Sequence, residues 1–204
     1  MRAGPFSGFG SVLLKVSVVA ARSIFLVGFS GTGKSTIARL VGEHLQWPVY
    51  DLDQVIVERS GMPIPVIFER EGEAGFRMRE REALHTIPDE TPCVVATGAG
   101  AVVAEENRRV MASKGWIVAL EGRPEVLYAR MQQQLQRAEP DAFRPLLHVE
   151  SPLEQIRALK DRRQAVYALA DWTVHTDRLS PHKVAAEVIR AANVLAHTAD
   201  PTAR

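Results

Sequence analysis

The sequence predicts an α/β protein whose parallel sheet is covered by helices on both faces. Five short apolar runs alternate with segments in which apolar residues recur every three or four positions. Runs that are apolar throughout are typical of strands buried on both faces. The expected strands are residues 24–27, 48–51, 92–97, 116–120 and 172–175.

Helices are expected in the intervals between these strands. After the first strand, five positions have helical spacing and predict one inward face: Ile37, Leu40, Val41, His44 and Leu45. The second interval is expected to contain a short helix over about 54–58, a break at 60–63, and a helical segment that leads through Gly72 to a longer helix ending near Pro88. The other helices are expected over residues 105–113, from 124, over 152–169 and from 181. Residues 137–145 lose the periodicity and contain two prolines, which predicts a mobile loop.

Length and composition favour one compact domain. The chain has 204 residues, of which 46% are hydrophobic and 24% charged, and its net charge of +1 offers no support for a nucleic-acid partner. The single cysteine, Cys93, excludes a disulfide within the chain and is expected in a buried strand. No apolar run is long enough to span a bilayer. We therefore expect a cytoplasmic monomer with a poorly ordered extension over residues 1–22 and a single domain over 23–204.

The first strand runs directly into a glycine-rich segment that predicts a phosphate-binding loop. Gly28 to Ser35 fits the pattern G-x-x-x-x-G-K-[ST], in which consecutive backbone N–H groups surround phosphate oxygens. Lys34 would add a positive charge, and Ser35 would hold Mg²⁺. The alternative is a plain turn between strand and helix, but the lysine, the hydroxyl and the flanking elements all favour the phosphate site.

Ligands of such sheets bind beyond the carboxyl ends of the strands, where Asp51 and Asp53 follow the second strand. In extended geometry both carboxylates can face the same side. One can hold a metal-bound water, and the other can accept a hydroxyl proton from an acceptor substrate. The alternative is a helix N-cap, for which Asp53 is the candidate.

Three arginines are candidates for binding anions. Arg163 shares a helical face with Ile156, Leu159 and Tyr167, so a permanent cation lies on a stripe that otherwise faces inward. It either meets a bound anion or extends to water and pairs with an acidic neighbour, Glu150 or Asp161. Arg77 can bind a ligand or simply pair with Glu80. Arg144, in the proline-bearing loop, can close over phosphates or remain solvated.

Together these segments resemble the shikimate kinase family over about residues 24–197. The resemblance rests on an ordered set of motifs: the phosphate loop, Asp51-Leu52-Asp53, Ile67-Phe68 through Gly72-Glu73 to Phe76-Arg77 and Glu80, Thr97-Gly98-Ala99-Gly100, Arg144-Pro145-Leu146-Leu147, and Arg163 four residues before Tyr167. It implies a P-loop, nucleoside-monophosphate-kinase-like fold with sheet order 2-3-1-4-5. It also implies transfer of the ATP γ-phosphoryl group to the 3-hydroxyl of shikimate, with Mg²⁺ as cofactor.

The resemblance also implies roles for individual residues. The catalytic set would be Lys34, Asp53 and Arg144. ATP would be held by Gly28, Ser30, Gly31, Thr32, Gly33, Lys34, Ser35, Thr36, Arg137, Arg144 and Arg178. Shikimate would be held by Asp53, Phe76, Arg77, Glu80, Gly98, Ala99, Gly100 and Arg163. Mg²⁺ would be held by Ser35 and, through water, by Asp51. The substrate-binding region would span about residues 53–85 and the lid about 135–150.

Two departures from the family pattern bear on activity. The family usually has three glycines where this chain has Gly98-Ala99-Gly100, and the Ala99 methyl group would crowd the substrate if that residue needs a positive φ. The lid lacks the glycines often found there and carries two acidic residues. Two alternatives therefore stay open: a kinase of the same fold acting on another hydroxylated acid such as gluconate, and a non-catalytic nucleotide-binding relative.

Overall fold

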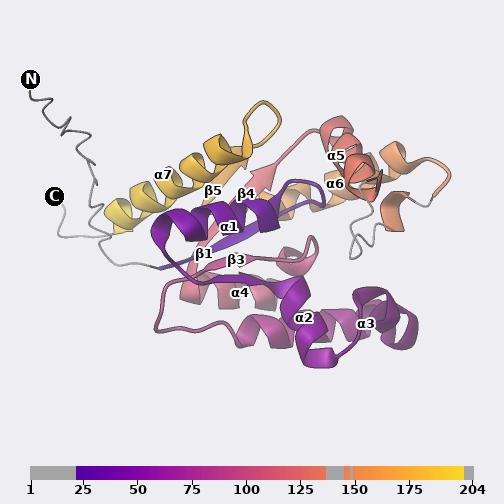
Figure 1. Cartoon of the computed structure of the whole chain (residues 1–204), viewed down its shortest axis with the longest axis horizontal. Helices are drawn as coiled ribbons and strands as arrows, with labels where there is room; N and C mark the ends of the chain where they lie inside the picture. The colour runs from indigo at the N-terminus through magenta and orange to yellow at the C-terminus, as the bar shows by residue number, and fades with distance from the viewer. Residues whose placement is uncertain (1–21, 137–144, 148, 200–204) are drawn as a thin grey trace, which may run out of the picture.

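The computed structural model describes residues 22–136, 145–147 and 149–199. Their five strands form one parallel sheet in the order β2-β3-β1-β4-β5 (Figure 1). The strands are β1 (Ser23–Gly28), β2 (Val49–Asp51), β3 (Val94–Ala96), β4 (Gly115–Glu121) and β5 (Trp172–His175). The predicted fold class and strand order are confirmed.

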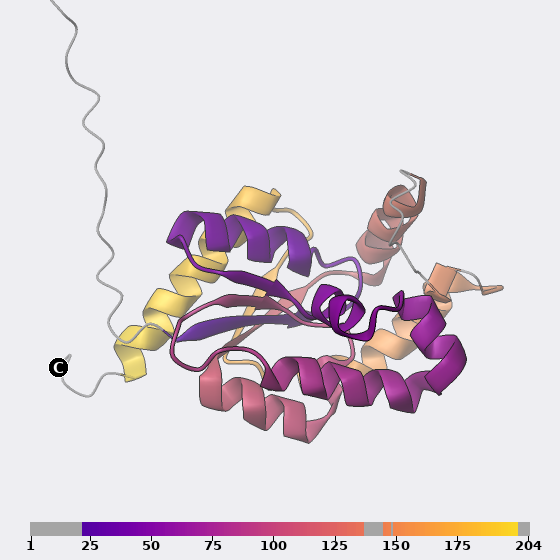
Figure 2. The same ribbon diagram turned by 60° about the horizontal axis from the view of Figure 1, so that its bottom comes forward.

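Seven α-helices and two short 3₁₀ segments occur in the described part of the chain. They are α1 (Lys34–Leu45), α2 (Leu52–Ser60), α3 (Ile64–His85), η1 (Ala101–Val103), α4 (Glu105–Lys114), α5 (Pro124–Gln136), η2 (Pro145–Leu147), α6 (Pro152–Tyr167) and α7 (Pro181–Ala199). Helices α1 and α7 cover one face of the sheet, and α4 lies on the other with the end of α3 (Figures 1 and 2). Helices α2, α5 and α6 lie near the carboxyl ends of the strands (Figures 1 and 2).

The central position of β1 in the sheet explains why residues 24–27 are all apolar. Ile24 and Leu26 pack into the cluster beneath α1 and α7, whereas Phe25 and Val27 pack into the cluster on the opposite face. All four side chains are fully buried. Both faces of β1 are therefore core, as expected for the middle strand of a covered parallel sheet.

The inward face of α1 differs from the prediction at His44. Its buried residues are Ile37, Ala38, Val41 and Gly42, whereas His44 is exposed. The helix turns its smaller residues inward because β2 passes close by: a Cβ at Gly42 would lie 2.1 Å from Val49 Cγ2. Counting apolar residues alone therefore placed the face slightly too far around the helix.

Helix α3 is interrupted at Gly72, as predicted. Gly72 has φ 67° and ψ −172°, a backbone conformation that favours glycine. Across this kink the Arg79 guanidinium binds the Glu71 carboxylate with two hydrogen bonds of 2.7 and 2.6 Å. The kink lets the first part of α3 turn back towards α2, with which α3 is extensively packed.

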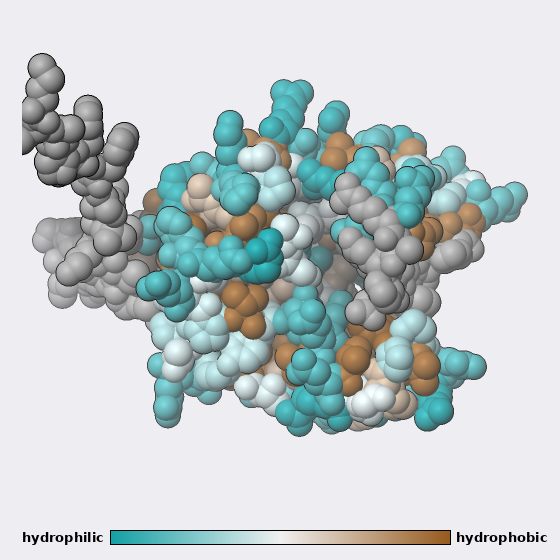
Figure 3. Space-filling view, in the orientation of Figure 1, coloured by the Kyte–Doolittle hydropathy of each residue, from teal (hydrophilic) through white to brown (hydrophobic). Residues whose placement is uncertain are grey.

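The surface shown in Figure 3 is mostly hydrophilic, with apolar side chains in small groups. Within residues 22–136, 145–147 and 149–199, no helix is both long and apolar enough to cross a membrane. Cys93 is buried beside Ser23, as expected, but it lies just before β3 rather than within the strand. The predicted extension lies outside the described residues except for Arg22, as do residues 137–144 of the predicted lid.

We expect Gly115→Ala to destabilise the fold by about 3 kcal/mol, because the added Cβ would lie 2.1 Å from the backbone oxygen of Ser23 in the neighbouring strand. Gly42→Ala is the matched control. There the closest atom, Val49 Cγ2 at 2.1 Å, belongs to a residue that is 40% exposed, and the nearest backbone atom is the Trp47 oxygen at 3.1 Å, so we expect a smaller loss of stability. Urea unfolding of both variants measures the difference. Equal losses of stability would contradict the assignment of the clash to the β1–β4 backbone.

Candidate active site

The phosphate loop joins β1 to α1, and its glycines are required by the backbone. Gly28, Gly31 and Gly33 have φ values of 139°, 81° and 93°, which L side chains rarely adopt. At Gly28 space is also limited, because a Cβ would lie 2.3 Å from the carbonyl oxygen of Leu120 on β4. Thr32 closes the loop by donating its hydroxyl to Phe29 O at 2.8 Å.

The loop ends at the N-terminus of α1 in a form suited to an anion. Gly33 occupies the N-cap position, makes no side-chain cap, and no acidic residue lies in the first turn. The positive end of the helix dipole is therefore uncompensated by side chains at this end. Lys34 Nζ donates to Gly28 O at 2.9 Å and to Phe29 O at 3.1 Å, so its ammonium lies over the loop.

Asp51 and Asp53 lie at the carboxyl end of β2 as expected, but the residue that caps α2 differs from the prediction. Asp51 ends β2 and caps α2, accepting a hydrogen bond from the Asp53 N–H at 3.1 Å. The candidate for the cap was Asp53, and this was wrong because the helix already begins at Leu52. Asp53 instead lies in the first turn of α2. Its Oδ1 is 3.4 Å from the position that a Cβ on Gly98 would occupy. Its carboxylate therefore faces the turn that follows β3.

Arg77 approaches the same turn from α3 and is held by an ion pair. Its Nη1 donates to Glu80 Oε2 at 2.9 Å, and its Nη2 donates to Glu73 Oε1 at 3.2 Å. The Glu80 side chain is 1% exposed whereas that of Glu73 is 71% exposed, so the Glu80 contact is the better shielded of the two. The predicted alternative, pairing with Glu80, is thus observed, and it leaves the guanidinium against Gly100.

Glu80 is a buried carboxylate with one oxygen available. Burial raises the pKa of Glu80, and the neighbouring Arg77 opposes that rise. Its Oε1 has no hydrogen-bond partner among the residues that the structure describes and points to the space beside Gly98. Phe76, next to Arg77, is buried and stacks on Phe68 with ring centroids 4.6 Å apart, so it supports the wall of this region.

The turn after β3 has two positions at which an added side chain would displace a neighbouring charged group. A Cβ at Gly98 would lie 2.3 Å from Glu80 Oε1, and one at Gly100 would lie 2.5 Å from both Nη atoms of Arg77. Ala99 lies between them and does not have a positive φ. Among the described residues, Gln46 is the non-glycine residue that does. The condition under which the Ala99 methyl would crowd the substrate is therefore not met.

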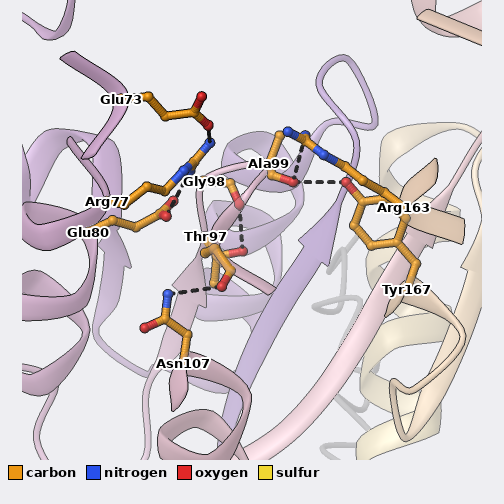
Figure 4. A network of polar contacts seen from close by, with 10 residues as sticks. Glu73, Arg77, Glu80, Thr97, Gly98, Ala99, Asn107, Arg163 and Tyr167 are labelled. Atoms are coloured by element: carbon orange, nitrogen blue, oxygen red, sulfur yellow. Dashed lines mark hydrogen bonds and ion pairs between the residues drawn. The ribbon is translucent and has the colours of Figure 1, made fainter. Parts of the chain in front are cut away.

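Arg163 and Tyr167 reach the turn from the opposite side, on α6 (Figure 4). The Tyr167 hydroxyl donates to Ala99 O at 2.8 Å, and Arg163 Nη1 donates to the same oxygen at 3.3 Å. Burial raises the pKa of Tyr167 to about 12, so this hydroxyl, already a donor at neutral pH, stays protonated further into alkaline pH. In the described chain neither Glu150 nor Asp161 pairs with Arg163. Two arginines from separate helices therefore flank one turn.

A second region lies at the end of β5. An open pocket of about 420 Å³ is lined by Arg123, His175, Asp177, Arg178 and Leu179, which places the predicted Arg178 at a concave surface. Sequence reasoning missed Arg130, whose guanidinium donates to Thr176 Oγ1 at 2.9 Å and Thr176 O at 2.7 Å. Its partner is 46 residues away, so spacing along α5 carried no signal. Arg137 and Arg144 lie outside the described residues.

The Ser35 hydroxyl and the Asp51 carboxylate fit a magnesium ion that takes most of its ligands from water and substrate phosphates. Ser35 lies in the first turn of α1, and Asp51 ends β2 at the same edge of the sheet. Among the described residues no group of three or more His, Cys, Asp or Glu side chains could hold a metal ion. Such a site suits Mg²⁺ completed by water and substrate phosphates rather than a cage of protein ligands.

Known proteins are similar to this chain in sequence and in structure. The sequence profile of the shikimate kinase family matches residues 30–193. The shikimate kinase of Legionella pneumophila (strain Corby) is 40% identical over 176 residues, covering 86% of this chain and 97% of its own. That of Dechloromonas aromatica (strain RCB) is 44% identical over 146 residues, covering 72% and 76%.

Solved structures give the same relationship. The shikimate kinase from Acinetobacter baumannii in complex with shikimate has a TM-score of 0.76 and 33% identity, over 89% of this chain and 97% of its own. A gluconokinase from Sinorhizobium meliloti 1021 has a TM-score of 0.62 at 18% identity, over 87% and 95%, and therefore shares the fold. The matched profile, the identities over most of the chain and the structural agreement show that this chain belongs to the shikimate kinase family.

Proposed function

We propose that this protein transfers the γ-phosphoryl group of ATP to the 3-hydroxyl of shikimate. The observation that carries the proposal is the pair of arginines, Arg77 and Arg163, on opposite sides of the turn after β3, next to the strand that leads into the phosphate loop. Two permanent cations beside a phosphate site suit an acceptor that bears a carboxylate. The family relationship and a relative solved with shikimate support the same acceptor.

The donor half of the site is the phosphate loop. Its backbone N–H groups and Lys34 would hold the phosphates, with Ser30, Thr36 and the loop glycines shaping the cradle. The Lys34 ammonium now bonds to loop carbonyls, so binding ATP would exchange those partners for phosphate oxygens. Arg178, at the pocket after β5, would lie beside the adenine. Arg137 at the adenine and Arg144 at the transferred phosphate remain predictions from sequence.

The acceptor half lies around residues 98–100. Arg77 and Arg163 would bind the shikimate carboxylate, and the turn would contact the ring through its backbone. Asp53 would bind the hydroxyl groups, orient the attacking one and accept its proton as the oxygen–phosphorus bond forms. Glu80 would keep Arg77 oriented, and Phe76 would hold that part of α3 in place.

Catalysis would depend mainly on alignment and neutralisation of charge. Phosphoryl transfer needs little covalent chemistry from the protein, so Lys34 and Arg144 would stabilise negative charge on the transferred group. Ser35 and, through water, Asp51 would hold Mg²⁺, which would neutralise phosphate charge. Closure of residues about 135–150 would exclude water from the reaction. We further propose that the enzyme acts as a cytoplasmic monomer without nucleic-acid or membrane partners.

A gluconate kinase is the second candidate, because a gluconokinase shares the fold. The identity of 18% supports no more than the fold, and the family profile favours shikimate. A non-catalytic relative is the third candidate. Its one sequence indication was Ala99, and the absence of a positive φ at that residue removes the reason for strain.

An acceptor panel tests the function directly. With Mg²⁺ and ATP, we expect ADP release to require shikimate and to stay at background with gluconate or with no acceptor. EDTA in excess over Mg²⁺ should abolish turnover, since phosphate charge is then not neutralised. Release of ADP that is indifferent to shikimate would exclude the proposed activity.

We expect Arg163→Lys to lower kcat/KM for shikimate by roughly 10–100-fold with little change in melting temperature. Lysine keeps the charge but loses the planar guanidinium that can bind a carboxylate with two parallel hydrogen bonds. Arg162→Lys, one residue earlier on an exposed position of α6, is the matched control. Normal turnover combined with a much lower melting temperature would instead make Arg163 a structural residue.

The turn provides a third test. Gly100→Ala should raise KM for shikimate by about tenfold or more, because its Cβ would displace the Arg77 guanidinium. Ala99→Gly should change KM by less than about threefold, since Tyr167 and Arg163 bind the Ala99 carbonyl, which remains. Steady-state kinetics with shikimate varied at saturating ATP measures both. The opposite order of effects would contradict the role assigned to Arg77.

A further inference from the structure

A polar cluster built on a buried ion pair lies at the end of β4, and none of its three side chains is assigned to either substrate. Glu121 Oε2 and Lys160 Nζ form an ion pair of 2.8 Å, with side-chain exposures of 8% and 13%. Gln164 Nε2 donates to Glu121 Oε1 at 3.3 Å, and Lys160 Nζ donates to Gln164 Oε1 at 2.8 Å. Three side chains thus satisfy one another and join the last residue of β4 to the middle of α6.

The cluster is connected to the site through helix α6. Helix α6 is attached to the turn after β3 by Tyr167 and Arg163, and to the end of β4 by Lys160 and Gln164. Strands β3 and β4 are the two neighbours of β1, which carries the phosphate loop. Helix α6 is therefore fastened on both sides of the strand that presents the phosphates.

The two attachments are coupled because a helix is stiff. Arg163 and Gln164 are adjacent residues, and each residue of an α-helix advances about 1.5 Å along the axis. A shift of α6 at Lys160 and Gln164 therefore moves the Arg163 guanidinium by a similar amount. Misplacement of a binding group by about 1 Å can cost on the order of 100-fold in rate.

We propose that Glu121 and Lys160 are positioning residues for the acceptor: their ion pair sets the place of α6, and so of Arg163, relative to the phosphate loop. This inference rests on the proposed function, because it assigns Arg163 to the acceptor carboxylate. Neither Glu121 nor Lys160 is assigned a contact with either substrate. Their effect should therefore appear in acceptor binding and alignment rather than in nucleotide binding.

A matched control exists on the same helix. Arg157 of α6 forms an ion pair of 2.7 Å with Glu125 of α5, but both side chains are 51% exposed. Water screens that pair, so its removal should have little effect on the place of the helix. The two pairs therefore separate a buried attachment at β4 from a solvated contact with α5.

The experiment compares Glu121→Gln, Lys160→Met, the double variant that carries both changes, Lys160→Arg and the control Glu125→Gln. Each is measured for KM of shikimate, KM of ATP, kcat and melting temperature. We expect Glu121→Gln and Lys160→Met each to raise KM for shikimate about tenfold or more while KM for ATP changes less than about twofold. Lys160→Arg, which preserves the ion pair, and Glu125→Gln should stay within about twofold of wild type.

The double variant distinguishes positioning from stability. A single substitution leaves a buried charge without its partner, which lowers the melting temperature, whereas the double variant removes both charges. We therefore expect the double variant to recover melting temperature but to keep the raised KM for shikimate. Recovery of both together would overturn the proposal, because the single-variant effect would then be one of stability.

The wild-type enzyme separates failure of this inference from failure of the proposed function. Wild-type turnover of shikimate with unchanged kinetics in Glu121→Gln and Lys160→Met would overturn the positioning role alone. Equal increases in KM for shikimate and for ATP would also overturn it, since the effect would not be confined to the acceptor. A wild-type protein that neither binds nor phosphorylates shikimate would overturn both.

Discussion

The close approach of β1 and β4 at Gly28 is the constraint from which the site develops. Gly28 pairs with Leu120 in the parallel ladder, and the Leu120 carbonyl leaves no space for a side chain there. The chain can therefore leave the buried strand with a positive φ and turn at once into the phosphate loop. Because β1 is flanked by β3 and β4, the ends of those two strands are the nearest supports for an acceptor.

The turn after β3 serves as the meeting point of two helices that are distant in sequence. From α3, Glu80 and Arg77 approach Gly98 and Gly100 so closely that a methyl group at either glycine would displace the carboxylate or the guanidinium. From α6, Tyr167 and Arg163 approach the carbonyl of Ala99 (Figure 4). The side chain of residue 99 is not involved in these contacts. An alanine is therefore compatible with the site at this one position of the three.

Charge in this region is arranged around two arginines that differ in their hydrogen-bond acceptors. Arg77 is balanced by the buried Glu80, whose raised pKa shows that desolvation outweighs the attraction of Arg77. Arg163 has a carbonyl oxygen as its hydrogen-bond acceptor rather than a carboxylate. Buried or half-buried guanidinium groups favour an anion in low dielectric. This electrostatic condition connects the geometry to a carboxylate-bearing acceptor, and Glu121 with Lys160 provides a separate, neutral attachment for the helix that carries Arg163.

The sequence by itself determined the fold class, the five strands and their helices, the phosphate loop and the interruption at Gly72, because these depend on local periodicity and backbone preference. It left the roles of Asp51 and Asp53, the orientation of α1 and the environment of Ala99 to the tertiary structure. The cap on α2 depends on where β2 ends, and the face of α1 depends on the passage of β2 beside Gly42. Partners such as Arg130 with Thr176, or Glu121 with Lys160, lie tens of residues apart along the chain. Only packing brings such pairs together, so spacing along the sequence carries no trace of them.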